Sequence, residues 1–192
     1  MLCANVGVQQ FGAIDRLTDD DWRFVIDVNV LGTIRTVRAF LPLLRRRDGY
    51  RRIVLTASLS VLAPAVRMAA YQTSKFAVLG FGETLRHELA PEGIGVSVLF
   101  PGGMMTGHLQ SSVEARPPAL VATGADDGDL VAMLAHRPVG PDDVVLPEHA
   151  VRNLLTDLDD DVPYIVTHGA IRSDYTARHD ALVAAIDRME TS

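Results

Sequence analysis

The chain has 192 residues, enough for one domain with a sizeable core, and its hydrophobic content of 48% and charged content of 22% are typical of a folded protein. A formal net charge of −6 leaves no general basic surface, so nucleic acid is not an expected partner. No apolar run is long enough to span a membrane, and the first residues lack the pattern of a signal peptide, so we expect a cytoplasmic protein with no membrane partner.

The apolar run over residues 2–8 predicts a short buried strand that ends in a turn. The single cysteine, Cys3, cannot form an internal disulfide, which fits a reducing cytosol. We expect it to be a small core residue rather than a nucleophile. Gly7 is either a turn glycine without a ligand or part of a binding site, and the run alone does not separate the two.

A long helix is predicted next. Thr18 is a suitable N-cap, and the aspartates at residues 19–21 favour the positive end of the helix dipole. We expect these carboxylates to be solvated rather than to form a metal site. Apolar residues recur at helical spacing up to Leu44, and arginines at residues 45–47 close the helix. Asn29 lies among valines and needs a hydrogen-bond partner, as either a satisfied core asparagine or a site residue.

Two further strands are predicted, and each is followed by polar or turn residues. The run 53–57 is followed by Ser58, and the run 94–100 by the turn Pro101-Gly102. Open α/β sheets bind ligands beyond the carboxyl ends of their strands. The sequence therefore predicts a binding site where these two strand ends meet.

Between these strands, residues 68–90 predict a long helix that carries Tyr71 and Lys75. Because they are four residues apart, the two side chains share one helix face. A nearby lysine ammonium favours the phenolate and lowers the tyrosine pKa from its usual value of about 10. Tyr71 would then be a usable general acid or base for an alcohol or a carbonyl. The alternative is a half-exposed tyrosine beside a solvated lysine.

Residues 109–146 carry the weakest signals of the chain. They suggest flexible loops around a short helix near residues 130–134. The acidic stretch 124–129 lacks the full spacing of a calcium-binding EF-hand, so no metal site is expected. His108 belongs to no motif, and we expect it to be a surface histidine.

The last elements are two helices and a strand. A helix is predicted from residue 147 to about residue 158, a strand over residues 164–168, and a closing helix over residues 173–189. His168 is expected to be structural. Three apolar residues of the closing helix are expected to face inward, namely Leu182, Val183 and Ile186.

Five pieces of the sequence resemble the short-chain dehydrogenase/reductase family in their order and spacing. They are Ala4-Asn5-Val6-Gly7, Asn29 within Val28-Asn29-Val30, Ser58, Tyr71-Gln72-Thr73-Ser74-Lys75 and Pro101-Gly102-Gly103-Met104-Met105-Thr106. The resemblance implies an α/β fold with a partial Rossmann-like, doubly wound parallel sheet, the C-terminal portion from the fourth strand onward. Residues 1–192 would form a single incomplete NAD(P)-binding domain, with a substrate lid over residues 109–146. The family pattern also implies a homodimer or homotetramer.

The resemblance implies a role for each matched residue. Ser58 would hydrogen-bond the substrate oxygen, with Ser60 as a loop residue. Tyr71 would transfer the proton, Lys75 would lower the tyrosine pKa and hold the nicotinamide ribose, and Asn29 would hold a relay water. Thr106 could also serve as a helix N-cap. The residues implied to contact NAD or NADP are Asn5, Gly7, Tyr71, Lys75, Pro101, Gly102 and Thr106.

The sequence departs from the family pattern at its start. The family fold begins with a βαβ unit whose glycine-rich turn holds the pyrophosphate, and no Gly-x-x-x-Gly-x-Gly follows a strand here. We therefore expect the first strand to have a bare apolar edge. Three explanations stay open: a start downstream of the true one, a fragment, or loss of the cofactor half.

The leading hypothesis is an NAD(P)-dependent oxidoreductase that interconverts a small-molecule alcohol and a carbonyl. The alternative is a truncated, non-catalytic relative that acts at most as an oligomerisation partner. A hydrolytic site with Ser58 as nucleophile and Lys75 as base is a third hypothesis. It lacks a Gly-x-Ser-x-Gly elbow and leaves Tyr71 without a role.

Overall fold

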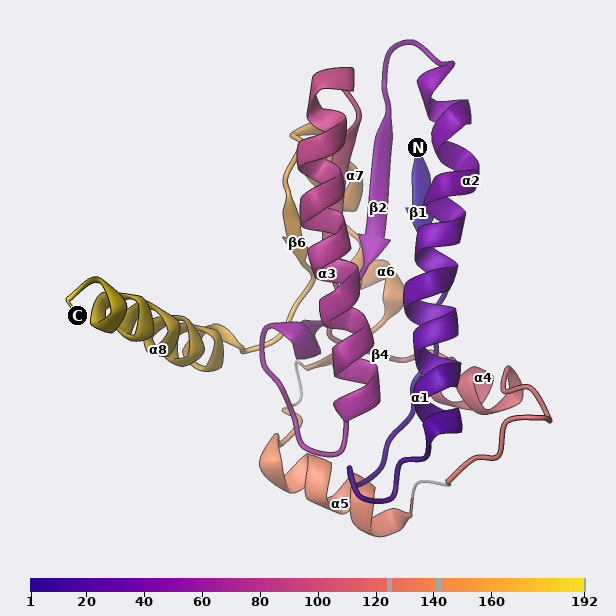
Figure 1. Ribbon diagram of the computed structural model, residues 1–192, viewed down its shortest axis with the longest axis vertical. Coiled ribbons are helices and arrows are strands. Elements are labelled where there is room, and N and C mark those ends of the chain that lie inside the picture. Colours follow the sequence, from indigo (N-terminus) through magenta and orange to yellow (C-terminus); the bar gives the residue numbers. More distant parts are fainter. Residues whose placement is uncertain (124–125, 141–142, 192) are drawn as a thin grey trace.

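A four-stranded parallel sheet forms the centre of the molecule (Figure 1). The computed structural model describes residues 1–123, 126–140 and 143–191. All neighbouring strands are parallel, in the order β1-β2-β3-β6. The sheet confirms the predicted α/β class, and its strands are β1 (Leu2–Ala4), β2 (Arg52–Thr56), β3 (Gly95–Phe100) and β6 (Tyr164–Val166).

Helices cover both faces of this sheet, as in a doubly wound fold. Helices α2 (Thr33–Arg45) and α3 (Ala69–Leu89) pack on one face, and in the view of Figure 1 strands β1 and β2 are seen between them. Helix α7 (Leu154–Asp159) packs on the other face, where Leu158 is fully buried. Every residue of β3 is buried, which explains why its sequence is apolar except for Ser97, whose hydroxyl donates to the carbonyl of Val162 at 2.7 Å.

The first long helix begins as predicted and contains an irregular segment. Thr18 caps α1 (Asp19–Ile26) in a reciprocal capping box with Asp21. A π-helical segment, Asp27–Gly32, then joins α1 to α2. The expectation that residues 19–21 are all solvated is wrong for Asp21, which is fully buried. Contacts from residues 116–123 cover the Asp21 side chain, and these contacts cannot be predicted from local sequence patterns.

Helix α3 lies close to the sheet because of one glycine. A Cβ added at Gly82 would lie 2.6 Å from Cγ2 of Val98 in β3. The glycine therefore allows the helix axis to approach the strand. Gly80 has no such neighbour, since a Cβ there would meet nothing within 4 Å.

Shorter elements connect and flank this core. The predicted helix near residues 130–134 lies within α5, and the helix predicted over residues 147–158 is divided into α6 and α7. Strands β4 and β5 form a separate two-stranded parallel sheet. The remaining elements are β4 (Gly103–Met104), α4 (His108–Glu114), α5 (Asp127–His136), β5 (Val144–Val145), α6 (Pro147–Ala150), α8 (Arg172–Glu190) and 3₁₀ turns at Leu59–Val61 and Ala90–Glu92.

Of the acidic stretch 124–129, residues 124–125 lie outside the described residues. Across the described ranges, the structure has no group of three or more His, Cys, Asp or Glu side chains placed to hold a metal ion. The described helices also include none with the length and apolar character needed to cross a membrane.

Two further predictions about burial are wrong. Cys3 is exposed, because it points away from the face of β1 on which Leu2 and Ala4 join the core. Helix α8 projects away from the body of the molecule (Figure 1), and none of its residues is buried. Its apolar residues Leu182, Val183 and Ile186 are 59%, 40% and 51% exposed instead of facing inward.

Strand β1 has a free edge, as expected. Within the described residues it pairs only with β2. Apolar side chains of β1, α2 and the loop before β2 line a groove of about 510 Å³ beside it. Met1, Phe40, Leu43 and Tyr50 of this groove are each about half exposed.

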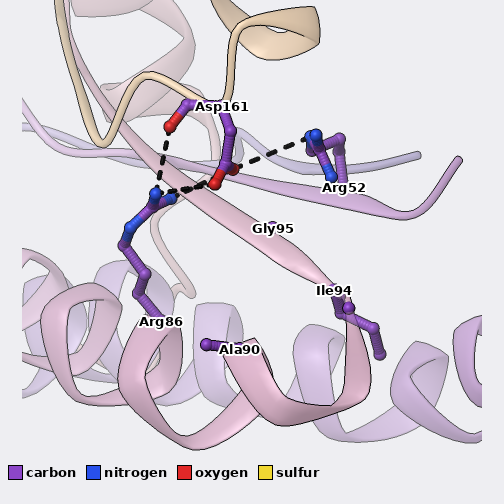
Figure 2. A pocket seen from close by; sticks show the side chains of 7 residues that line it. Arg52, Arg86, Ala90, Ile94, Gly95 and Asp161 are labelled. Carbon is purple, nitrogen blue, oxygen red and sulfur yellow. Dashed lines mark hydrogen bonds and ion pairs between the residues drawn. The ribbon is translucent and has the colours of Figure 1, made fainter.

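At the amino end of β3, two arginines surround Asp161 (Figure 2). Arg86 of α3 donates to the two carboxylate oxygens of Asp161 at 2.8 and 3.2 Å, and to its backbone carbonyl at 3.0 Å. Arg86 also donates to the backbone carbonyl of Val96 at 2.7 Å, while Nε of Arg52 lies 3.8 Å from Asp161. The cluster ties the segment before β6 to α3 and β3.

We predict that Arg86→Ala lowers the free energy of unfolding by about 1–2 kcal/mol, because several acceptors lose a charged donor that is only partly exposed. Urea denaturation measures the loss. Arg45→Ala is the matched control, since its ion pair with Glu92 is more exposed, and it should unfold close to the parent. Equal losses in both variants would show that the Asp161 cluster has no special role.

Candidate active site

The carboxyl ends of three strands bring the predicted site residues to one edge of the sheet. Asn5 follows β1, and its Oδ1 accepts a hydrogen bond of 2.9 Å from Oγ1 of Thr56 at the end of β2. Pro101 follows β3, and its carbonyl accepts from the backbone N–H of Leu59 at 2.9 Å. Hydrogen bonds therefore join the loops after β1, β2 and β3 into one surface.

Lys75 is buried at this edge. Its side chain rises from α3, the residue is 4% exposed, and Nζ donates to the carbonyl of Thr56 at 2.9 Å. Burial disfavours the charged ammonium and lowers the pKa of Lys75 to about 8. Lys75 is also the only lysine among the 192 residues.

Tyr71 lies one turn before Lys75 and is 8% exposed, so the half-exposed alternative is wrong. Nζ of Lys75 lies 5.7 Å from the centre of the tyrosine ring. Burial raises the pKa of Tyr71, and a hydrogen bond with Ser58 opposes this shift. The expected lowering of the pKa by Lys75 is therefore not seen in this structure, because desolvation of the phenolate dominates.

Ser58 begins the 3₁₀ turn after β2, and its geometry distinguishes it from Ser60. Oγ of Ser58 accepts hydrogen bonds from the backbone N–H of Ser60 at 3.2 Å and from Oγ of Ser60 at 3.0 Å. A hydroxyl has one proton to donate, so that of Ser58 is left for Tyr71 or a ligand. Ser60 supports Ser58 from the loop.

Asn29 is 1% exposed within the π-helical segment, and its side chain holds the turn after β1. Oδ1 accepts from the backbone N–H of Val8 at 2.7 Å, and Nδ2 donates to the Val8 carbonyl at 2.9 Å. Nδ2 also donates to Oγ of Ser74 in α3 at 2.9 Å. This asparagine is fully satisfied, and it joins the first turn of the chain to the helix that carries Lys75.

The Pro101-Gly102 turn is supported by His168. The backbone N–H of Gly102 donates to Oγ1 of Thr167 at 3.2 Å, and a Cβ at Gly102 would lie 2.6 Å from the His168 ring. Nε2 of His168 lies 2.8 Å from the carbonyl oxygen of Gly103. His168 thus has a structural position, as expected.

His108 is the residue that sequence reasoning missed. Its ring centre lies 6.5 Å from that of Tyr71, with the planes inclined by 57°. Burial lowers the pKa of His108, and the charge of Lys75 adds to this shift. Thr106 is not the N-cap of α4, which is Gly107, although Oγ1 of Thr106 accepts from the backbone N–H of His108 at 3.4 Å. No spacing signal in the sequence links residue 108 to Tyr71, because the two residues belong to different helices, α4 and α3.

The fold and the buried tyrosine–lysine pair define a Rossmann-like α/β protein of the dehydrogenase class. A comparison with family models agrees, because the model described as short chain dehydrogenase matches residues 1–117. This is more than half of the chain, which therefore belongs to the short-chain dehydrogenase family.

Several known proteins are similar. The mitochondrial D-beta-hydroxybutyrate dehydrogenase of Rattus norvegicus is 38% identical over 104 residues, which cover 54% of this chain and 30% of that protein. The 17-beta-hydroxysteroid dehydrogenase type 1 of Homo sapiens is 36% identical over 110 residues, which cover 57% and 33%. The chain thus spans about a third of the length of these two relatives.

A solved structure resembles most of the fold. The crystal structure of a short-chain dehydrogenase/reductase from Burkholderia phymatum in complex with NAD has a TM-score of 0.83 and 29% identity. The match covers 96% of this chain and 66% of that one. Over the matched residues, the chain therefore shares the fold of that structure.

The residues present fit one end of such a cofactor. A Cβ at Gly7 would lie 3.2 Å from Nζ of Lys75 and 3.3 Å from Oδ1 of Asn29, so a side chain here would press on both groups, and glycine leaves them room. An ammonium has three protons, of which the bond to Thr56 uses one, so Lys75 can also donate to a ribose hydroxyl. The sequence contains no glycine-rich turn for the pyrophosphate.

Because Lys75 is the only lysine, carbon-13 lysine labelling and NMR will follow its titration alone. We predict a pKa of about 8 in the folded chain and about 10.4 in the urea-unfolded chain. The unfolded state then holds more protons between these values, so stability rises with pH through that window. A folded-state pKa near the unfolded one would contradict the burial of the ammonium.

Proposed function

We propose that this chain is the catalytic part of an NAD(P)-dependent oxidoreductase that interconverts a small-molecule alcohol and a carbonyl, with Tyr71 as general acid/base. The observation that carries the proposal is the burial of Tyr71 and Lys75 together, with Ser58 bonded to the tyrosine, at the carboxyl ends of a parallel sheet. The similarity to hydroxybutyrate and hydroxysteroid dehydrogenases, and to a structure in complex with NAD, supports it.

Tyr71 and Ser58 act on the substrate oxygen. Burial keeps the tyrosine hydroxyl protonated at neutral pH, so in the reductive direction it can donate its proton to a carbonyl oxygen. Ser58 donates a hydrogen bond to the same oxygen and orients it. A bound nicotinamide cofactor would supply or accept the hydride.

Lys75 and Asn29 support the proton transfer. With a pKa of about 8, Lys75 is mostly protonated at neutral pH, and its ammonium lies 5.7 Å from the centre of the Tyr71 ring. It would also hold the nicotinamide ribose. Asn29, whose backbone carbonyl accepts from Oγ1 of Thr33 at 2.7 Å, would hold a relay water.

The cofactor contacts at the turns are Asn5 and Gly7 after β1, and Pro101, Gly102 and Thr106 after β3. The proposal also includes assembly as a homodimer or homotetramer, which the exposed apolar side chains of α8 support. A cytoplasmic location is supported by the single exposed cysteine, which fits a reducing compartment.

Calorimetric titration with NADH and then NADPH tests the cofactor site directly. We predict saturable binding of at least one of them, and its loss in Lys75→Met, which keeps a long side chain at the buried position without the ammonium. Arg45→Met, with its exposed ion pair, is the control that should bind like the parent. The nucleotide that binds more tightly identifies the cofactor.

The competing function is a non-catalytic relative that associates with other subunits, and the free apolar edge of β1 favours it. A folded chain that releases no binding heat with either nucleotide would support this alternative and contradict a cofactor site within these residues.

We predict that Tyr71→Phe lowers oxidoreductase turnover by roughly 10²–10⁴-fold, the usual contribution of a positioned acid or base. The assay follows nicotinamide absorbance with a panel of ketones and hydroxy acids. Tyr50→Phe, at an exposed tyrosine outside the site, is the matched control. Full activity in the Tyr71 variant would contradict the role of Tyr71 as general acid/base, provided that circular dichroism shows both variants folded.

A further inference from the structure

A second buried charge lies outside the residues assigned above. Asp21 in the first turn of α1 is fully buried, and its Oδ1 accepts a hydrogen bond of 2.6 Å from Nη2 of Arg116. The Arg116 side chain is 9% exposed. A buried ion pair adds little net stability, since both charges lose their hydration, so its presence calls for a positional role.

Arg116 belongs to residues 106–123, called the lid segment below, which follow β4, contain α4 and overlap the substrate lid expected over residues 109–146. Within this segment Arg116 donates to the carbonyls of Leu120 and Val121, both at 3.0 Å. Outside the segment it donates to Oε1 of Gln10 at 3.1 Å, and its guanidinium lies 5.1 Å from the centre of the Phe24 ring. One planar cation thus joins the lid segment, the loop after β1 and helix α1.

The aspartate holds the segment at a second point. Both its carboxylate oxygens accept from Thr123, one from the backbone N–H and one from the hydroxyl. Oδ2 also accepts from the backbone N–H of Thr18, which fixes the orientation of the carboxylate at the start of α1. Leu120 packs against the apolar cluster around Phe24, to which Trp22 also belongs.

Helix α4 itself is held by Ser112, which is 2% exposed. Its Oγ accepts from the backbone N–H of Gln9 at 3.0 Å and donates to the carbonyl of His108 at 2.6 Å. The helix is therefore fixed to the loop after β1 at Ser112 and to α1 at Arg116. His108 begins this helix, and its ring centre lies 6.5 Å from that of Tyr71.

We infer that Asp21 and Arg116 form a latch that fixes the lid segment across the loop after β1 and so positions His108 beside Tyr71, as one wall of the substrate pocket. Asp21 and Arg116 are positioning residues in this scheme, because neither touches the reacting atoms. The catalytic consequence rests on the proposed function, while the latch itself does not.

The test uses Arg116→Lys and Arg116→Met in the whole chain. Both leave the cap between Asp21 and Thr18 intact, which an aspartate variant would destroy. Lysine keeps the charge but lacks the planar fork, so it should not rescue the latch. The matched controls are Arg23→Lys and Arg23→Met. Arg23 lies on α1, the helix that carries Asp21, and makes an exposed ion pair with Asp20.

Two readouts report the latch without any enzyme activity. Trp22 is the only tryptophan in the chain and shares the cluster with Leu120, so release of the lid segment should increase its quenching by acrylamide and shift its emission to the red. His108 should also become exposed, and its pKa, followed by NMR and assigned with His108→Gln, should rise toward the ordinary value of about 6.5.

Both readouts should change in the two Arg116 variants and stay unchanged in the two Arg23 variants, with the far-UV circular dichroism preserved throughout. Unchanged Trp22 quenching and His108 titration in Arg116→Lys and Arg116→Met would overturn the latch. With an active chain, the Michaelis constant should rise more than turnover falls, and unchanged kinetics after lid release would overturn the positioning role. If the parent chain shows no activity at all while the Arg116 variants release the lid segment, the result counts against the proposed function and still supports the latch.

Discussion

The site depends on one costly feature, a lysine ammonium taken out of water. Lys75 is 4% exposed, and burial alone brings its pKa to about 8. The charge is held by the carbonyl of Thr56 at the end of β2, and the missing side chain of Gly7 leaves it room. The end of β2, the turn after β1 and helix α3 must therefore meet at one point, which fixes the geometry around Tyr71.

Asn29 secures that meeting point. Its amide gives the backbone of Val8 both a donor and an acceptor, much as a neighbouring strand would, where the chain has already left β1. The π-helical segment directs this side chain inward, and the bond from Nδ2 to Ser74 adds α3 to the same network. Loss of the two hydrogen bonds between Asn29 and Val8 would release the turn that places Gly7 beside Lys75.

The sequence could predict the sheet, the helices and the residues at the strand ends, because each follows from local patterns of apolar and capping residues. It could not predict the sign of the pKa shift of Tyr71, since a neighbouring charge is visible in a sequence and burial is not. The apolar spacing in α8 predicted a helix correctly, yet a periodic face does not reveal whether anything packs against it. The contact between Asp21 and Arg116 joins residues 95 positions apart, so no local pattern reports it.

Asp21 and Asn29, whose polar contacts lie on either side of the candidate site, belong to one continuous helix formed by α1 and the π-helical segment. Asp21 lies near the start of α1 and Asn29 lies in the π-helical segment, eight residues or about 12 Å further along. Asn29 holds the floor formed by the turn after β1, and Asp21 holds the lid segment through Arg116. Removing one residue between them would rotate one contact by about 100° relative to the other. The length of this helix therefore sets the separation between the turn after β1, which Asn29 holds, and residues 116–123, which Asp21 holds.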